Sequence, residues 1–196
     1  HIRRVRGLLP ALLAAIGQGF GRAVVPATQL REAALVDGLV AYGANRLDDL
    51  FDILEGGPGA DITPAEPTVD PVPTGRDLAD VAGQVEGKWA LEVAAAGRHH
   101  LYFHGPPGVG KTLLAERLPT ILPDLELWEA LEVSAVHSLA GLALDEGLVR
   151  RPPYSDPHHS ASMASLVGGG ARIAMPGAVS RAHRGVLFLD EAPEFS

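Results

Sequence analysis

Apolar and polar positions alternate with the periods of short helices and strands over the first 55 residues. Helical periods with an apolar face cover LLPALLAAI, QLREAALV and NRLDDLFDIL, and Asn45 is the expected N-cap of the last helix. Between them, RAVVPA and GLVAYGA have the pattern of short strands, the first of which is stopped by Pro26. This alternation predicts a small α/β piece with a parallel or mixed sheet. Because it has too few strands for a free-standing domain, we expect its N-terminal half to be missing.

The hydrophobic period is lost over residues 56–76, where five prolines and four glycines occupy twenty-one positions, and we predict a linker there. From residue 77 onward the pattern predicts a turn and a helix (DLADVAGQVEGKWALEVAAAG), a strand (LYFH) and two helices (KTLLAERLPTIL and WEALEVSAVHSLAG). Residues 148–180 are rich in Gly, Pro, Ser and His, which indicates an inserted loop or hairpin. The apolar run RGVLFLDE then predicts a buried strand that ends in two acids.

The composition is that of a globular chain, with 46% hydrophobic residues, no cysteine and a net charge of −8. The absence of cysteine excludes disulfides and thiolate metal sites and fits a cytoplasmic protein. The acidic balance argues against coating of nucleic acid by the whole surface, but residues 150–184 carry five arginines against Asp156 alone. This basic stretch is either a phosphate-binding surface or a solvated face with internal ion pairs.

No apolar run reaches the ~18–20 residues of a membrane span, so we expect no membrane partner. The first residues, RRVRGLLPALLAAIGQG, imitate a secretory signal, but the chain begins with His1 and has no clean cleavage site. We therefore expect a piece of a longer protein rather than a signal peptide.

The segment GPPGVGKT, residues 105–112, matches the pattern G-x-x-x-x-G-K-[ST] between a predicted strand and a predicted helix. Its glycines would let backbone N–H groups point at a polyphosphate, toward the positive end of the following helix. Lys111 would contact the β- and γ-phosphates and aid catalysis, and the Thr112 hydroxyl would ligate Mg²⁺. The predicted ATP-binding residues are Gly105, Pro106, Pro107, Gly108, Val109, Gly110, Lys111, Thr112 and Leu113. The alternative is an ordinary strand–turn–helix corner.

The second acidic motif is Asp190-Glu191, at the end of the apolar run GVLFL. The carboxyl end of a central parallel strand opens at the ligand crevice of an α/β sheet. Asp190 would therefore hold Mg²⁺, and Glu191 would polarise the attacking water as the catalytic base. By contrast, His158 and His159 are not expected to hold a structural metal, because neighbouring side chains diverge and no cysteine or carboxylate pattern accompanies them.

Four stretches together resemble the AAA+ module of Mg-chelatase-like ATPases over residues 77–196. They are HGPPGVGKTLLAERLPTILP, EALEVSAVHSLAGL, RPPYSDPHHSASMASLVGGG and AHRGVLFLDEAPEF. Chelatase motor subunits carry an acidic-and-arginine motif where this chain has its histidine pair, so the resemblance is to the competence-associated type. One departure is Ala178, where the family more usually has an acid.

The resemblance implies an α/β fold, the three-layer αβα core of P-loop NTPases, present here incompletely. It implies a hexameric homo-oligomer that binds ATP and Mg²⁺ and acts on DNA as a branch-migration motor in natural transformation. It also implies nucleotide contacts just upstream of the first strand of the module, at Val81, Gly83 and Gln84. Residues 1–55 resemble the C-terminal part of a Lon-protease-like domain, but they contain neither lysine nor serine, so dyad proteolysis is excluded there.

The sensor, arginine finger and helical lid of AAA+ rings follow the Asp-Glu motif in this family, and residues 77–196 represent the N-terminal part of such a domain. We therefore expect nucleotide binding by this chain, with its own turnover left open. Two alternative functions also stay open. One is a chelatase motor that drives metal insertion into a tetrapyrrole, and the other is a nucleotide-binding scaffold without turnover.

Overall fold

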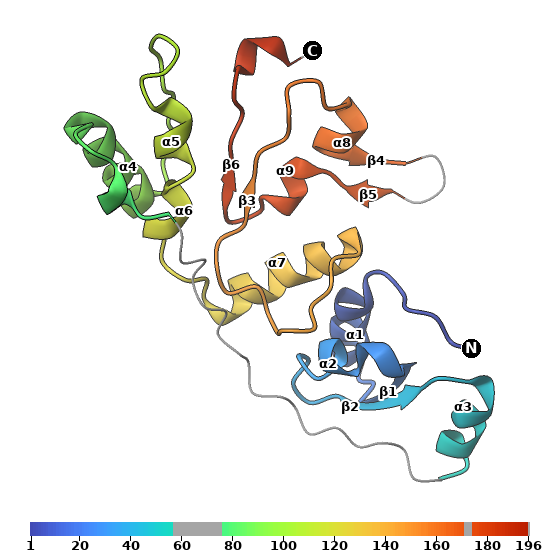
Figure 1. Cartoon of the computed structure of the whole chain (residues 1–196). Coiled ribbons are helices and arrows are strands. Elements are labelled where there is room, and N and C mark those ends of the chain that lie inside the picture. Colours follow the sequence, from blue (N-terminus) through green and yellow to red (C-terminus); the bar gives the residue numbers. More distant parts are fainter. Residues whose placement is uncertain (57–75, 171–173, 196) are drawn as a thin grey trace. The chain divides into compact units, whose positions relative to one another are not determined.

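The computed structural model describes residues 1–56, 76–170 and 174–195, so the predicted linker lies almost entirely outside the described residues. The chain divides into two compact units (Figure 1). The first unit consists of residues 1–69 and 127–149, and the second of residues 70–126 and 150–196. Residues 127–149 thus group with the N-terminal residues, although they are flanked in sequence by parts of the second unit.

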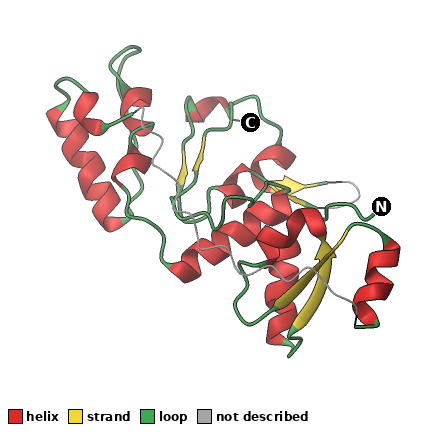
Figure 2. Ribbon diagram, turned by 60° about the horizontal axis from the view of Figure 1, so that its bottom comes forward, coloured by secondary structure: helices red, strands yellow, loops and turns green. Residues whose placement is uncertain are grey.

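The first unit contains all the elements that the sequence predicts for residues 1–55, together with one helix from further along the chain. Strands β1 and β2 pair in parallel (Figure 2). Their register runs from Arg22 opposite Val40 to Pro26 opposite Ala44. The predicted parallel sheet is therefore confirmed. The elements are α1 (Leu8–Gly17), β1 (Arg22–Pro26), a 3-10 turn (Ala27–Gln29), α2 (Leu30–Ala33), β2 (Val40–Ala44), α3 (Leu47–Leu54) and α7 (Leu127–Ala140).

Close packing in the first unit explains why residue 43 is a glycine. A Cβ at Gly43 would collide with the side chain of Leu30, so β2 can approach α2 only without a side chain there.

The start of α3 differs from the prediction, because the N-cap of this helix is Arg46, not Asn45. The carboxylate of Asp49 accepts the backbone N–H groups of Asn45 at 2.8 Å and Arg46 at 3.0 Å, which fixes the first turn one residue later.

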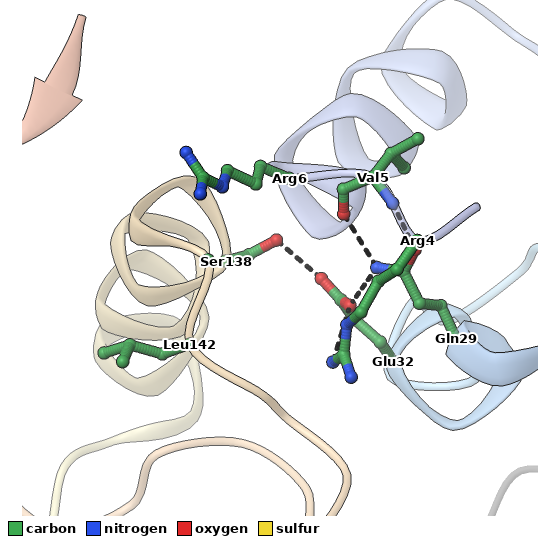
Figure 3. A pocket seen from close by; sticks show the side chains of 8 residues that line it. Arg4, Val5, Arg6, Gln29, Glu32, Ser138 and Leu142 are labelled. Atoms are coloured by element: carbon green, nitrogen blue, oxygen red, sulfur yellow. Dashed lines mark hydrogen bonds and ion pairs between the residues drawn. The ribbon is translucent and has the colours of Figure 1, made fainter. Parts of the chain in front are cut away.

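A buried polar network joins α2 to α7 in the first unit (Figure 3). Ser138 on α7 donates its hydroxyl to Glu32 on α2, and the Gln29 amide donates to the other Glu32 oxygen at 2.8 Å. Gln29 also accepts the backbone N–H of Val5 at 2.7 Å. Glu32 and Gln29 are each only 1% exposed. These hydrogen bonds therefore satisfy polar groups that would be costly to bury alone.

The second unit contains a cluster of short helices and two small two-stranded sheets among its described residues. Strand β3 is parallel to β6, and β4 is antiparallel to β5, which confirms a hairpin-like pairing in the segment 148–180. The elements are a 3-10 turn (Leu78–Asp80), α4 (Val85–Gly97), α5 (Lys111–Ala115), α6 (Leu118–Ile121), β3 (Tyr154–Ser155), α8 (Met163–Val167), β4 (Gly168–Gly169), β5 (Met175–Pro176), α9 (Ala178–Arg181), β6 (Val186–Leu187) and a 3-10 turn (Ala192–Glu194).

An apolar cluster underlies the glycine-rich segment of the second unit. It buries Leu78, Val81, Leu91 and Leu114, and it is flanked by Phe103, Leu118 and Ile121. Leu91 lies on α4 and Leu114 on α5, so the cluster fixes the helix that follows residues 105–110 against the helix that precedes them. Gly87 on α4 permits this contact, because a Cβ there would lie 2.6 Å from a methyl group of Leu114.

Two predicted strands are shorter or absent in the described part of the chain. Residues 101–106 have no strand structure, and Tyr102 is 79% exposed while Phe103 packs on the apolar cluster. The run RGVLFLDE forms a strand only at β6, because prolines 152, 153 and 157 flank its two-residue partner β3 and cannot donate to a ladder. The structure is thus mixed α/β with small sheets, and the complete three-layer core stays a prediction.

The predicted helix KTLLAERLPTIL is divided into α5 and α6. Pro119 lacks the N–H that a continuous helix would require, and the chain turns before it. Arg117 stabilises the break, since its guanidinium donates to the backbone carbonyls of Leu113 at 2.9 Å and Asp77 at 3.1 Å. No helix within the described ranges is long and apolar enough to cross a membrane.

Candidate nucleotide-binding site

Residues 105–110 form a turn whose backbone requires glycine at two positions. Gly108 has φ of 79° and Gly110 has φ of 90°, both in the left-handed region that strains other residues. Gly110 is also the residue from which α5 begins. The sequence pattern therefore has a local physical cause, because the chain can reverse direction and enter the helix within these few residues.

Lys111, at the start of α5, reaches back across this turn. Its ammonium donates hydrogen bonds to the carbonyl oxygens of Gly105 at 2.9 Å and Pro106 at 3.0 Å. Both partners are neutral, and an ammonium bonds more strongly to an anionic oxygen than to a neutral one. The positive charge is therefore held at the turn, on partners that a phosphate group can replace.

Thr112 and Asp190 lie together, although 78 positions separate them in the sequence. The Thr112 hydroxyl donates to Oδ2 of Asp190 at 3.1 Å. The other Asp190 oxygen, Oδ1, accepts the backbone N–H of Glu191 at 3.0 Å. Both side chains are exposed, so their oxygen atoms are accessible from solvent.

The predicted contacts upstream of the glycine turn differ in their surroundings. The Gln84 amide donates to the carbonyl of Val109 at 2.6 Å, so this side chain contacts the turn directly. Val81 is 2% exposed within the apolar cluster, and Gly83 is exposed with φ of 66°. Gln84 is therefore the member of this set that the structure brings to the turn, and nucleotide contact by all three stays a prediction.

His159, one of the two adjacent histidines, contacts Glu191 beyond the end of β6, and the sequence did not predict this contact. Nδ1 of His159 lies 3.1 Å from Oε2 of Glu191. The rings of His158 and His159 pack with centroids 4.1 Å apart, so the expectation that these side chains diverge is wrong. Nδ1 of His158 is hydrogen-bonded to the Ser160 hydroxyl at 2.8 Å, which restrains the His158 ring.

Tyr154 on β3 is a second residue that the sequence argument missed. Its ring stacks on Phe188 with centroids 6.4 Å apart, and its buried hydroxyl has no hydrogen-bond partner among the described residues. Burial, together with the nearby charge of Asp156, raises the pKa of the Tyr154 phenol to about 12. The proline-flanked segment around Tyr154, RPPYSDP, has no pattern that predicts either property.

A glycine turn that carries a lysine and a hydroxyl beside an acidic strand end is typical of P-loop nucleotide-binding modules. The family model described as magnesium chelatase, subunit ChlI, matches residues 77–196. The chain therefore belongs to the magnesium chelatase subunit ChlI family, whose members are AAA+-like ATPases. The sequence-based assignment to Mg-chelatase-like proteins is confirmed.

Whole-chain similarity extends to bacterial proteins that are considerably longer. An uncharacterised protein of Mycobacterium tuberculosis is 56% identical over 199 residues, which cover 100% of this chain and 39% of that protein. Competence protein ComM of Haemophilus influenzae is 45% identical over 202 residues, again 100% of this chain and 39% of the relative. The chain thus spans about two fifths of the length of these relatives.

A weaker similarity is to Lon protease 2 of Bacillus subtilis, at 33% identity over 129 residues, which are 61% of this chain and 23% of that protein. At this extent the similarity does not establish a Lon-like domain, and the resemblance of residues 1–55 stays a prediction.

Proposed function

We propose that the second unit binds Mg·ATP between the glycine turn and the end of β6, as the nucleotide-binding module of an AAA+ motor. One observation carries this proposal: the Thr112 hydroxyl and the Asp190 carboxylate meet at 3.1 Å, directly beside the turn that Lys111 spans. Nothing in an ordinary strand–turn–helix corner requires an acid that is distant in sequence to lie beside the hydroxyl that follows the lysine. The proposed phosphate-contacting residues are those of the segment 105–113.

The phosphate-binding step follows from the hydrogen bonds of Lys111. On binding, its ammonium would exchange the carbonyls of Gly105 and Pro106 for phosphate oxygens, which are better acceptors because they are charged. The backbone N–H groups of the turn would then face the same anion. Gln84, through its bond to the Val109 carbonyl, would hold the turn in this conformation.

The donor set at Thr112 and Asp190 fits magnesium. Both offer oxygen atoms, which are the ligands that Mg²⁺ prefers. When bound, the ion would neutralise phosphate charge. Thr112 and Asp190 would hold it, directly or through water, once their mutual hydrogen bond opens.

Glu191 is the proposed base that activates the attacking water. Its side chain is 64% exposed and one of its oxygens is held by His159, so the carboxylate is accessible and oriented. General-base catalysis by a positioned carboxylate contributes about 10²–10⁴-fold in rate. Replacement by glutamine would therefore preserve nucleotide binding and remove most of the turnover.

For the complete protein we propose a cytoplasmic, hexameric motor that remodels DNA, as in branch migration during natural transformation. Similarity to competence protein ComM at 45% identity supports this over a role in metal insertion. The arginines of residues 150–184 support DNA contact less directly, because Arg151 already pairs with Asp124 at 3.0 Å. The second candidate is a chelatase motor, which the family description favours.

Measurement of ATP hydrolysis by the complete protein that carries these residues distinguishes a DNA motor, a chelatase motor and a scaffold. Stimulation of hydrolysis by branched or single-stranded DNA, and not by a porphyrin with its partner subunits, supports the DNA motor. The reverse pattern supports the chelatase motor. Nucleotide binding without turnover under any condition would instead identify a scaffold, with Glu191→Gln as the matched control that binds ATP without hydrolysing it.

A further inference from the structure

A contact between His159 and Glu191 links the histidine pair to the acid that is proposed as the catalytic base. His159 lies in the segment between β3 and α8, and Glu191 lies just beyond β6, so parallel strands bring the two together. Nδ1 of His159 is 3.1 Å from Oε2 of Glu191. The contact occupies one carboxylate oxygen and leaves the other, Oε1, for a water molecule.

Stability is a poor explanation for this contact. The two side chains are 33% and 64% exposed, and ion pairs between such exposed groups contribute little to folding because water screens them. The contact therefore affects the orientation of the Glu191 carboxylate more than the free energy of folding.

Further contacts restrain both Glu191 and His159. Glu191 has a left-handed backbone with φ of 53°, and its N–H is bound to Asp190, whose second oxygen accepts from Thr112. The His159 ring packs on the His158 ring, which Ser160 fixes in turn. A continuous set of contacts thus runs from the hydroxyl beside the glycine turn, through both acids, to the histidine pair.

We propose that His159 is a positioning residue, which orients the Glu191 carboxylate toward the water that attacks the γ-phosphate. The proposal rests on the function proposed above for Glu191. A carboxylate on an exposed left-handed residue samples several rotamers, and only some of them aim an oxygen at the phosphate. A misplacement of about 1 Å can cost about 10²-fold in rate, so one fixed contact is sufficient to matter.

The experiment compares kcat and KM for ATP in the complete protein that carries these residues. His159→Ala should lower kcat about ten- to a hundredfold and leave KM for ATP and nucleotide affinity unchanged. His159→Asn, which keeps a donor near the Nδ1 position, should recover a large part of kcat. His100→Ala, at an exposed histidine after α4, is the matched control and should change neither constant.

A double-mutant cycle shows whether His159 acts through Glu191. In the Glu191→Gln background, His159→Ala should have almost no further effect on kcat, because the group that it orients has already been removed. Equal losses in both backgrounds, or a kcat that is unchanged or raised by His159→Ala, would overturn the proposal.

A direct readout on this chain is the imidazole ¹⁵N spectrum, in which the His159 signal should shift with Glu191→Gln and not with Glu194→Gln. An unmoved His159 signal would also overturn the proposal. If the wild-type protein binds no ATP, the proposed function fails first. If it binds and hydrolyses ATP normally after His159→Ala, only the positioning role fails.

Discussion

The hydroxyl of Thr112 and the carboxylate of Asp190 are hydrogen-bonded at 3.1 Å, across 78 positions of sequence. Thr112 lies on α5, and Asp190 follows β6, which pairs with β3 at Val186 and Leu187. The sequence predicts that both residues share one magnesium ion, and this requires that the two side chains lie close together. Their proximity makes a shared ion geometrically reasonable and supports the proposed nucleotide site.

Removal of the Thr112 hydroxyl should weaken binding of ATP only when magnesium is present. Thr112→Ala deletes one of two proposed oxygen ligands, so we expect a loss of about tenfold in Mg·ATP affinity, or about 1.4 kcal/mol, and little loss in EDTA. Thr112→Ser keeps the hydroxyl and serves as the control. Isothermal titration calorimetry measures both conditions, and an equal loss with and without magnesium would contradict the proposed ligand role.

The buried Tyr154 hydroxyl should contribute nothing to stability. Because it has no hydrogen-bond partner among the described residues, Tyr154→Phe removes an uncompensated polar group and should leave the free energy of unfolding unchanged or raise it by about 1 kcal/mol. Tyr102→Phe, at a residue that is 79% exposed, is the control. Urea denaturation measures both variants, and a clear loss of stability for Tyr154→Phe would show that its hydroxyl has a partner.

Glu32 should be essential for the stability of the first unit. Glu32→Ala leaves the Ser138 hydroxyl and a Gln29 amide hydrogen buried without their acceptor (Figure 3), at a cost of about 2–3 kcal/mol. Thermal denaturation should therefore show a lower Tm for the first unit, whereas Glu55→Ala at an exposed site should show none. A Tm that Glu32→Ala leaves unchanged would mean that the network is not formed in solution.

Asp49 should titrate below the ordinary range of an aspartate. The backbone N–H groups of Asn45 and Arg46 stabilise its charged form and lower its pKa. A depressed pKa means that the interaction contributes to stability above the unfolded-state value of about 3.9 and is lost as pH falls through the folded-state value. An NMR titration of the carboxyl carbon measures this, and a midpoint at or above the ordinary value would contradict the capping geometry.

The sequence predicted short-range structure and the parallel sheet of the first unit well, and the extent of two strands in the second unit poorly. Helix α1, strand β1 and strand β2 follow from local periodicity and from breakers such as Pro26 and Gly17. The short β6 could not be foreseen, because its length depends on prolines in a partner segment some thirty positions upstream. Similarly, the apolar run at 101–104 has a strand-like pattern, but no partner strand pairs with it within the described residues.

In the candidate site, too, some features could be predicted from the sequence and others could not. The glycine turn and Lys111 were readable from spacing, since phosphate binding demands those residue types in that order. The contacts of Glu191 with His159, and of Glu32 with Ser138, join residues that are distant in sequence. Such pairs carry no local pattern, and only the folded chain brings them together.

The nucleotide affinity of Lys111→Ala, compared with Lys88→Ala, tests the central claim most directly. These are the two lysines of the chain, and Lys88 lies on α4, outside the glycine turn. Calorimetric titration with ADP and magnesium should show a loss of at least about tenfold for Lys111→Ala, because a charge-assisted contact to phosphate is removed, and no change for Lys88→Ala. If a folded Lys111→Ala variant binds nucleotide as tightly as the wild type, the glycine turn is not a phosphate site.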